Sequence, residues 1–129
     1  MSKSKILSLV CIYQGKTSII NQAFKLMGRE VFTSQCALSQ LTSANMQPRE
    51  AWAHYVKSLP VPVKCVYENQ ADQDLFYVFN KNTPCVIAIC SYNQKILLLD
   101  KNDLANCHGD ISLFDMYIHT ATKAKFLTF

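Results

Sequence analysis

The stretch NTPCVIAICSYNQKILLLD, residues 82–100, contains two short apolar runs joined by a polar link. The runs CVIAIC (85–90) and KILLLD (95–100) have the length of β-strands, and the SYNQ link between them is the size of a hairpin turn. Thr83 and Pro84 stand immediately before the first run, at the end of the break NKNTP. The stretch therefore predicts an antiparallel hairpin that begins directly after a Thr-Pro pair.

Upstream of this hairpin, strand-like and helix-like segments alternate. Strands are expected at 5–13, 30–34 and 61–68, and helices at 18–27, 48–59 and 71–79. Residues 36–46 fit either a helix or a loop, and a last helix is expected from Asp110 or Ser112 to about Thr122. The tail KAKFLTF fits a last strand or helix turn, a frayed end or a docking peptide.

This order of elements predicts the class of the fold. Strands separated by helices pair in parallel, whereas the hairpin adds an antiparallel edge. We therefore expect an α/β fold with a mixed sheet of four or five strands flanked by helices. The length of 129 residues allows one domain, which we expect to span residues 1–129.

Composition limits the classes of partner. Only 17% of the residues are charged, so we expect a protein partner to cover part of the surface. Residues 1–64 hold eight Lys or Arg and two Glu, a charge of +6, and residues 65–129 hold five Lys and seven Asp or Glu, a charge of −2. The positive residues form no run and include two arginines, a pattern that argues against nucleic-acid binding. No window is apolar for the ~20 residues of a membrane span.

The cysteines indicate a reducing compartment. Six are present, several of them inside apolar runs, where a cysteine behaves as a small apolar side chain. They show no zinc-ligand spacing, and the three histidines stand apart, so we expect no metal and no cofactor. The N-terminal MSKSKILSLVCIY reads better as a first strand than as an export signal. We expect a cytoplasmic protein, or a periplasmic one if an export signal has been removed.

The order of elements resembles the thioredoxin family over nearly the whole chain. In that family a cis-proline precedes the fourth strand, where Thr83, Pro84 and Cys85 stand here. The active-site cysteines of the family follow the second strand, where the motif Cys-Ala-Leu-Ser places Cys36 first and Ser39 in the position of the second cysteine. The resemblance implies a thioredoxin-like three-layer sandwich with a cis bond before Pro84. The phrase ADQDLFYVFNKNTP is also similar to thioredoxin-like pilus-assembly proteins of conjugative systems, which lack the paired cysteines.

Two functions follow from this resemblance. The first is a redox-degenerate binding module, which holds a protein partner at Thr83, Pro84 and Cys85 and at the loop around Cys36. The resemblance to pilus-assembly proteins implies a secretion or conjugation apparatus as one setting for such a module. The alternative is a monothiol oxidoreductase with Cys36 as nucleophile and Ser39 in place of the resolving thiol, for which glutathione would be a suitable substrate. In a third class, an unrelated α/β adaptor, Pro84 would be trans and distant from Cys36.

Overall fold

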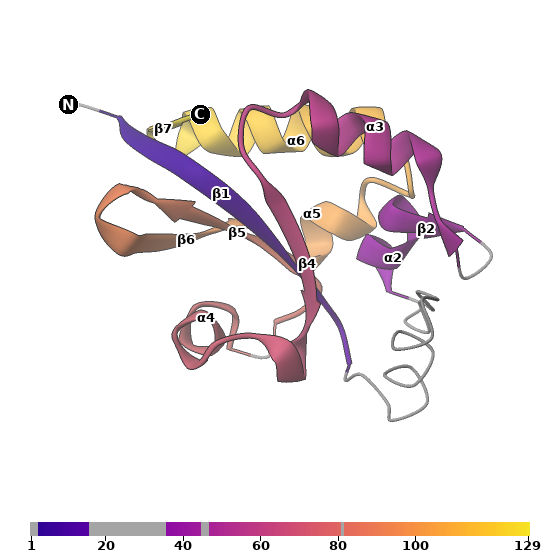
Figure 1. Cartoon of the computed structure of the whole chain (residues 1–129), viewed down its shortest axis with the longest axis horizontal. Coiled ribbons are helices and arrows are strands. Elements are labelled where there is room, and N and C mark those ends of the chain that lie inside the picture. The colour runs from indigo at the N-terminus through magenta and orange to yellow at the C-terminus, as the bar shows by residue number, and fades with distance from the viewer. Residues whose placement is uncertain (1–2, 16–35, 45–46, 81) are drawn as a thin grey trace.

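A computed structural model describes residues 3–15, 36–44, 47–80 and 82–129 of the chain (Figure 1). The strands are β1 (Ser4–Tyr13), β2 (Ser43–Ala44), β3 (Gln47–Pro48), β4 (Val63–Tyr67), β5 (Cys85–Cys90), β6 (Gln94–Leu99) and β7 (Leu127–Thr128). The α-helices are α2 (Ala37–Thr42), α3 (Glu50–Ser58), α4 (Gln73–Phe79), α5 (Lys101–Ala105) and α6 (Ile111–Ala124). Two single-turn 3₁₀ helices, η1 (Glu68–Gln70) and η2 (Ser91–Asn93), join neighbouring elements.

The first strand lies at the centre of a five-stranded mixed sheet. Its main path runs in the order β4-β1-β5-β6, and β7 pairs with the start of β1. β1 is parallel to β4, with Cys11 opposite Cys65, and antiparallel to β5, with Ile12 opposite Cys85. β5 and β6 form the antiparallel hairpin. The mixed α/β sheet is therefore confirmed, but the parallel pairing expected of strands separated by helices is wrong for β5, which is antiparallel to β1 and lies inside the sheet.

The sheet separates two apolar clusters because successive side chains of a strand point to opposite faces. The larger cluster includes Cys11 and Tyr13 of β1 and packs under α2, α3, α5 and α6, whereas the smaller one includes Val10 and Ile12 and packs under α4. Figure 1 shows α3 and α6 above the sheet and α4 below it. Helices therefore flank both faces, and within the described residues more of them lie on the face of the larger cluster.

Local sequence signals explain where the larger helices begin and which side they bury. The Asp110 carboxylate accepts hydrogen bonds from the backbone N–H groups of Ser112 and Leu113, which caps α6. Asp100 and Asp103 form a reciprocal capping box at the start of α5. On α3, Trp52 is buried in the larger cluster, and Tyr55, Val56 and the C-cap residue Leu59 pack against that cluster.

Most of the expected elements occur at their predicted places. The strands at 5–13, 61–68, 85–90 and 95–100, and the helices at 48–59 and 71–79, correspond to β1, β4, β5, β6, α3 and α4. The ambiguous stretch 36–46 begins as α2, and the apolar tail ends as β7, with Leu127 buried beside β1. The sequence analysis missed α5. The helix expected at 18–27 and the strand expected at 30–34 lie outside the described residues.

Candidate functional site

The peptide bond between Thr83 and Pro84 is cis and stands directly before β5. The Thr83 side chain is buried, and its hydroxyl donates a hydrogen bond to Oε1 of Glu68 in η1. The backbone N–H of Glu68 in turn donates to the carbonyl oxygen of Gly15, 3.3 Å away, just after β1. Three segments that are distant in sequence therefore meet at one end of the sheet, which we call the cis-proline edge (Gly15, Glu68, Thr83, Pro84 and Cys85).

At this edge, the residues just before β5 lie beyond the last pair of the ladder between β1 and β5. The ladder between β1 and β5 runs as far as Ile12 opposite Cys85, so Thr83 lies beyond the paired part of β5. The hydrogen bond to Glu68 fixes its side chain. This arrangement positions the backbone of Thr83 at the border of the sheet, where an extended chain could pair with it.

Cys85 is poorly suited to nucleophilic chemistry. Its side chain is fully buried and belongs to the smaller cluster, beside α4. Burial, followed by the nearby Glu68 carboxylate, raises the pKa of the Cys85 thiol to about 12. The thiol therefore stays protonated at neutral pH, and the residue acts as part of the apolar core.

Cys36 and Ser39 lie on α2, in the larger cluster. Cys36 takes the N-cap position with an extended backbone and is 9% exposed. The Ser39 hydroxyl donates to the carbonyl oxygen of Cys36 at 2.7 Å, which ties the side chain into the first turn of the helix. The sheet lies between the cluster that holds Cys36 and the cluster that holds Cys85. The structure thus brings Thr83, Pro84 and Cys85 together, and places Cys36 and Ser39 on the other face.

All six cysteines lie within the described residues, and no disulfide joins any two of them. Cys11 and Cys65 are neighbours on the parallel strands β1 and β4. A hydrogen bond with Cys65, together with burial, raises the pKa of the Cys11 thiol. These two thiols contribute to the packing of the larger cluster, as the sequence analysis expected of most of the cysteines.

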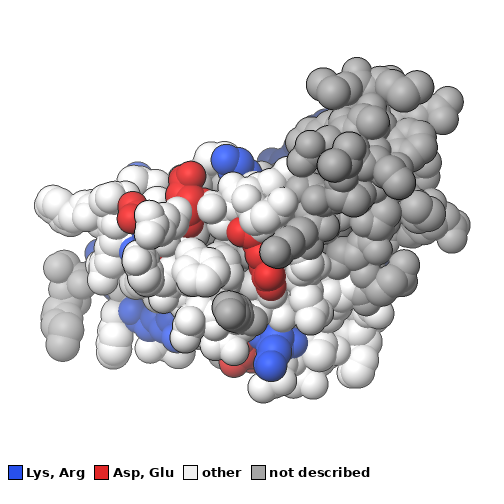
Figure 2. Space-filling view, turned by 90° about the horizontal axis from the view of Figure 1, so that it is seen from below, with Lys and Arg blue, Asp and Glu red and all other residues white. Residues whose placement is uncertain are grey.

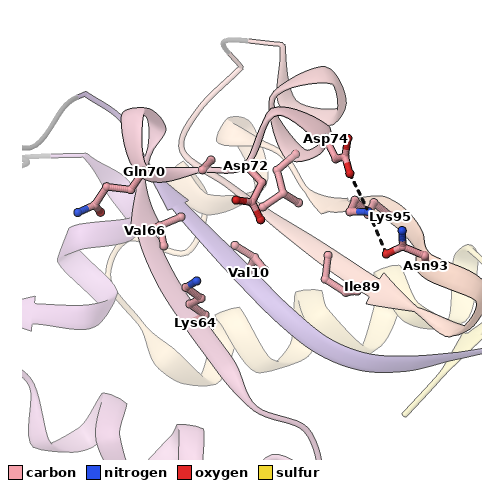
Figure 3. Close-up of a pocket in the computed structure, with 11 residues that line it drawn as sticks. Val10, Lys64, Val66, Gln70, Asp72, Asp74, Ile89, Asn93 and Lys95 are labelled. Carbon is pink, nitrogen blue, oxygen red and sulfur yellow. Dashed lines mark hydrogen bonds and ion pairs between the residues drawn. The ribbon is translucent and has the colours of Figure 1, made fainter.

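The sequence analysis missed a cavity on the face that carries α4 (Figure 3). It has a volume of about 320 Å³, and its floor is formed by side chains of β1, β4 and β5. Its apolar lining is Val10, Val66, Ala71, Leu75 and Ile89, and its polar lining is Lys64, Gln70, Asp72, Asp74, Asn93 and Lys95. We call it the α4 pocket. A periodicity signal existed, because the alternation in VPVKCVYE places Lys64 on the face opposite Val63 and Cys65.

Charges of both signs surround this pocket. Lys95 lies 3.8 Å from a carboxylate oxygen of Asp74, and its ammonium donates to Oδ1 of Asn93 at 3.1 Å. Figure 2 looks onto the side of the molecule below the sheet of Figure 1, and it shows lysines and acidic residues interspersed among uncharged side chains. The described part of this side therefore presents a mixed pattern rather than a field of one sign.

His119 of α6 has a structural partner. Its Nε2 lies 3.2 Å from Oδ1 of Asp115, and the same oxygen accepts a hydrogen bond from the Tyr55 hydroxyl at 2.8 Å. Among the described residues, no group of three or more His, Cys, Asp or Glu side chains is arranged to hold a metal ion. Within the same residues, no helix has both the length and the apolar character needed to cross a bilayer.

Comparisons of the chain with protein-family models, with curated proteins and with solved structures gave no match. Any functional assignment therefore rests on the chemistry of the sites described above.

Proposed function

We propose that the protein is a redox-degenerate, thioredoxin-like binding module that holds an extended segment of a protein partner at the cis-proline edge. The observation that carries this proposal is the position of Thr83, which lies beyond the last ladder pair of β5 and is held there by its hydrogen bond to Glu68. An extended segment can add backbone hydrogen bonds at such a border, and neighbouring side chains then select its sequence. A role within a secretion or conjugation apparatus is one setting for such a module.

The electrostatics of the edge favour binding over thiol chemistry. Catalytic thiolates need a lowered pKa, which basic neighbours or a helix N-terminus supply. At this edge the adjacent thiol, Cys85, has a raised pKa because it is buried beside the Glu68 carboxylate. A thiolate at Cys85 would be destabilised by both causes.

The alternative function, monothiol exchange with a glutathione-type substrate, depends on Cys36. Its N-cap position on α2 is the observation in favour, because backbone N–H groups gather at the start of a helix. Its place in the larger cluster puts Cys36 on the opposite side of the sheet from Cys85 and away from the cis-proline edge. Binding without catalysis is therefore the function that the geometry supports best.

The test is a selection from a random-peptide display library, followed by titration of the purified peptides into four proteins. These are the wild type, Cys36→Ser, Pro84→Ala and Pro60→Ala, the last being a matched control at an exposed proline before β4. We expect peptides to bind the wild type, Cys36→Ser and Pro60→Ala equally, and Pro84→Ala at least about tenfold more weakly.

Thermal unfolding of each variant checks that the fold persists, and Glu68→Ala, which removes the acceptor of the Thr83 hydrogen bond, provides a second probe of the edge if Pro84→Ala does not fold. Binding by Pro84→Ala and Glu68→Ala equal to that of the wild type would rule out the cis-proline edge as the peptide site. Rapid alkylation of Cys36 by iodoacetamide with an apparent pKa below about 7.5 would favour the monothiol enzyme instead.

A further inference from the structure

The α4 pocket has the size and lining of a site for a small amphipathic molecule. Its volume of about 320 Å³ is at the lower end of the range for ligand pockets. Val10, Val66 and Ile89 supply an apolar floor from three adjacent strands, and Leu75 of α4 supplies an apolar wall. The floor belongs to three paired strands of the central sheet, and side chains on such strands are positioned more precisely than side chains on loops.

Two of the charged groups that line the pocket, Lys64 and Asp72, have no ionic partner within the described residues. Lys95 is already engaged by Asp74 and Asn93. Asp72 stands at the N-cap of α4 without a side-chain capping hydrogen bond, and among the described residues neither Asp72 nor Lys64 forms an ion pair or a side-chain hydrogen bond. Figure 3 shows both side chains around the same apolar floor, one from the α4 segment and one from β4.

This pair of opposite charges selects the ligand by its own charge pattern. A purely anionic ligand would be attracted to Lys64 but repelled by Asp72. A purely cationic ligand would be attracted to Asp72 but repelled by Lys64. A molecule with one positive and one negative end satisfies both groups. Its apolar body would then pack over the floor, where Val10 and Val66 are already buried and Ile89 is half-buried, and would remove the remaining apolar surface from water.

We propose that the α4 pocket binds a small zwitterion with an apolar body, which is the chemistry of a short apolar peptide with free ends. The ammonium of the ligand pairs with Asp72, and its carboxylate pairs with Lys64. The apolar side chains of the ligand pack on Val10, Val66 and Ile89. This inference does not rest on the peptide-binding function of the cis-proline edge, because it uses other residues.

The test titrates leucyl-leucine into the full chain and follows the methyl NMR signals of the pocket valines and Ile89. N-acetyl-leucyl-leucine, which lacks the ammonium, and leucyl-leucinamide, which lacks the carboxylate, are the matched ligands. We expect the zwitterion to bind about fivefold more tightly than either matched ligand, since each contact is a partly exposed ion pair. The shifts should be confined to the pocket.

Two variants assign each end of the ligand. Asp72→Asn should abolish the preference for leucyl-leucine over its N-acetyl form and keep the preference over its amide, and Lys64→Gln should do the reverse. Glu50→Gln and Lys57→Gln on α3 are controls of the same charge change on the other face, and both should bind like the wild type.

Several results would overturn the assignment. These are equal affinity for the three ligands, preferences that do not change in the variants, shifts centred outside the pocket, or no saturation up to about 10 mM leucyl-leucine. Because Pro84→Ala is expected to leave this titration unchanged, failure of the pocket and failure of the cis-proline edge can be told apart.

Discussion

Among the described residues, the two faces of the sheet differ in how completely helices cover them. On one face α2, α3, α5 and α6 enclose the larger apolar cluster, in which Leu38, Leu41 and Leu104 are fully buried. On the other face the seven-residue α4 encloses the smaller cluster and leaves the α4 pocket open beside it (Figure 3). Both faces use the same strands, with alternate residues pointing each way.

This difference suggests a division of roles. Burial of apolar surface is the main source of folding stability, so the more completely covered face should contribute more of it. In the pocket, the charged groups of Lys64 and Asp72 lie beside an apolar floor. A well-enclosed core does not contain charges without partners, because burying them costs too much free energy. We therefore expect substitutions on the covered face to affect mainly stability, and substitutions in the pocket to affect mainly binding.

The largest loss of folding stability is expected from truncating an aromatic side chain of the larger cluster, on the face that α2, α3, α5 and α6 cover. Phe114 of α6 is buried, and its ring packs edge-on against Trp52 and Tyr55 at centroid distances of 5.4 and 5.8 Å. Phe114→Ala should lower the free energy of unfolding by about 4 kcal/mol, and Leu75→Ala in α4, on the other face, by about 2 kcal/mol. Urea denaturation measures both, and a larger loss for Leu75→Ala would reverse the comparison.

A second pair of variants tests what a buried hydroxyl contributes to stability with and without a hydrogen-bond partner. Both hydroxyls belong to tyrosines of the larger cluster. The Tyr13 hydroxyl shares a 2.6 Å hydrogen bond with the Thr42 hydroxyl, whereas the Tyr67 hydroxyl is buried with no hydrogen-bond partner among the described residues. Tyr13→Phe should cost about 2 kcal/mol because it leaves the buried Thr42 hydroxyl unpaired.

Tyr67→Phe should be neutral or slightly stabilising, because it removes a polar group whose desolvation is uncompensated. Denaturant melts of the two variants on the same day give the difference directly. Equal losses would mean that the Tyr67 hydroxyl has a partner in solution.

A third comparison is between two helix N-caps, one on each face of the sheet. Asp110 caps the fourteen-residue α6 through two backbone N–H groups, whereas Asp72 makes no side-chain capping bond to α4. Asp110→Ala should therefore lower stability by about 1.5 kcal/mol, and Asp72→Ala by less than about 0.5 kcal/mol. A loss at Asp72 as large as that at Asp110 would show that Asp72 caps α4 after all. Thermal unfolding at neutral pH is sufficient to distinguish the two results.

The smallest effect is a change in the pH dependence of stability. The folded-state pKa of Cys85 is about 12, above the ordinary value of 9.0, so the folded state holds the thiol proton more tightly than the unfolded state. The stability that this provides is fully present below pH 9 and is lost as the pH rises towards 12. Between pH 8 and 10 the wild type should lose about 1 kcal/mol more than Cys85→Ala. The free energy of unfolding is measured against pH for both proteins. If it falls equally in the two, Cys85 has an ordinary pKa in the folded state.

Much of the fold could be predicted because its elements carry local signals. The apolar runs of β1 and β5, the hairpin link and the Asp110 cap are all visible in the sequence. The opposite orientation of Cys85 and Cys90 follows from strand parity, and the structure confirms it. The five-residue α5 was missed because it is short and begins directly after a strand.

The candidate sites were harder to predict because they combine distant segments. The family resemblance implied the cis bond at Pro84, and that bond is present. The hydrogen bond from Thr83 to Glu68 joins residues fifteen positions apart, and no periodicity signals it. The separation of Cys36 from Cys85 by the sheet likewise depends on where α2 packs.

The sequence by itself determined the alternation of strands and helices, the residues of each strand that face the core, and the hairpin after Pro84, because these depend on the preferences of neighbouring residues. Only the tertiary structure decided that β1 lies at the centre of the sheet, that Glu68 meets Thr83, and that Lys64 and Asp72 border one apolar pocket. Those outcomes depend on how whole elements pack against one another, and that information is distributed over the chain rather than contained in any one segment.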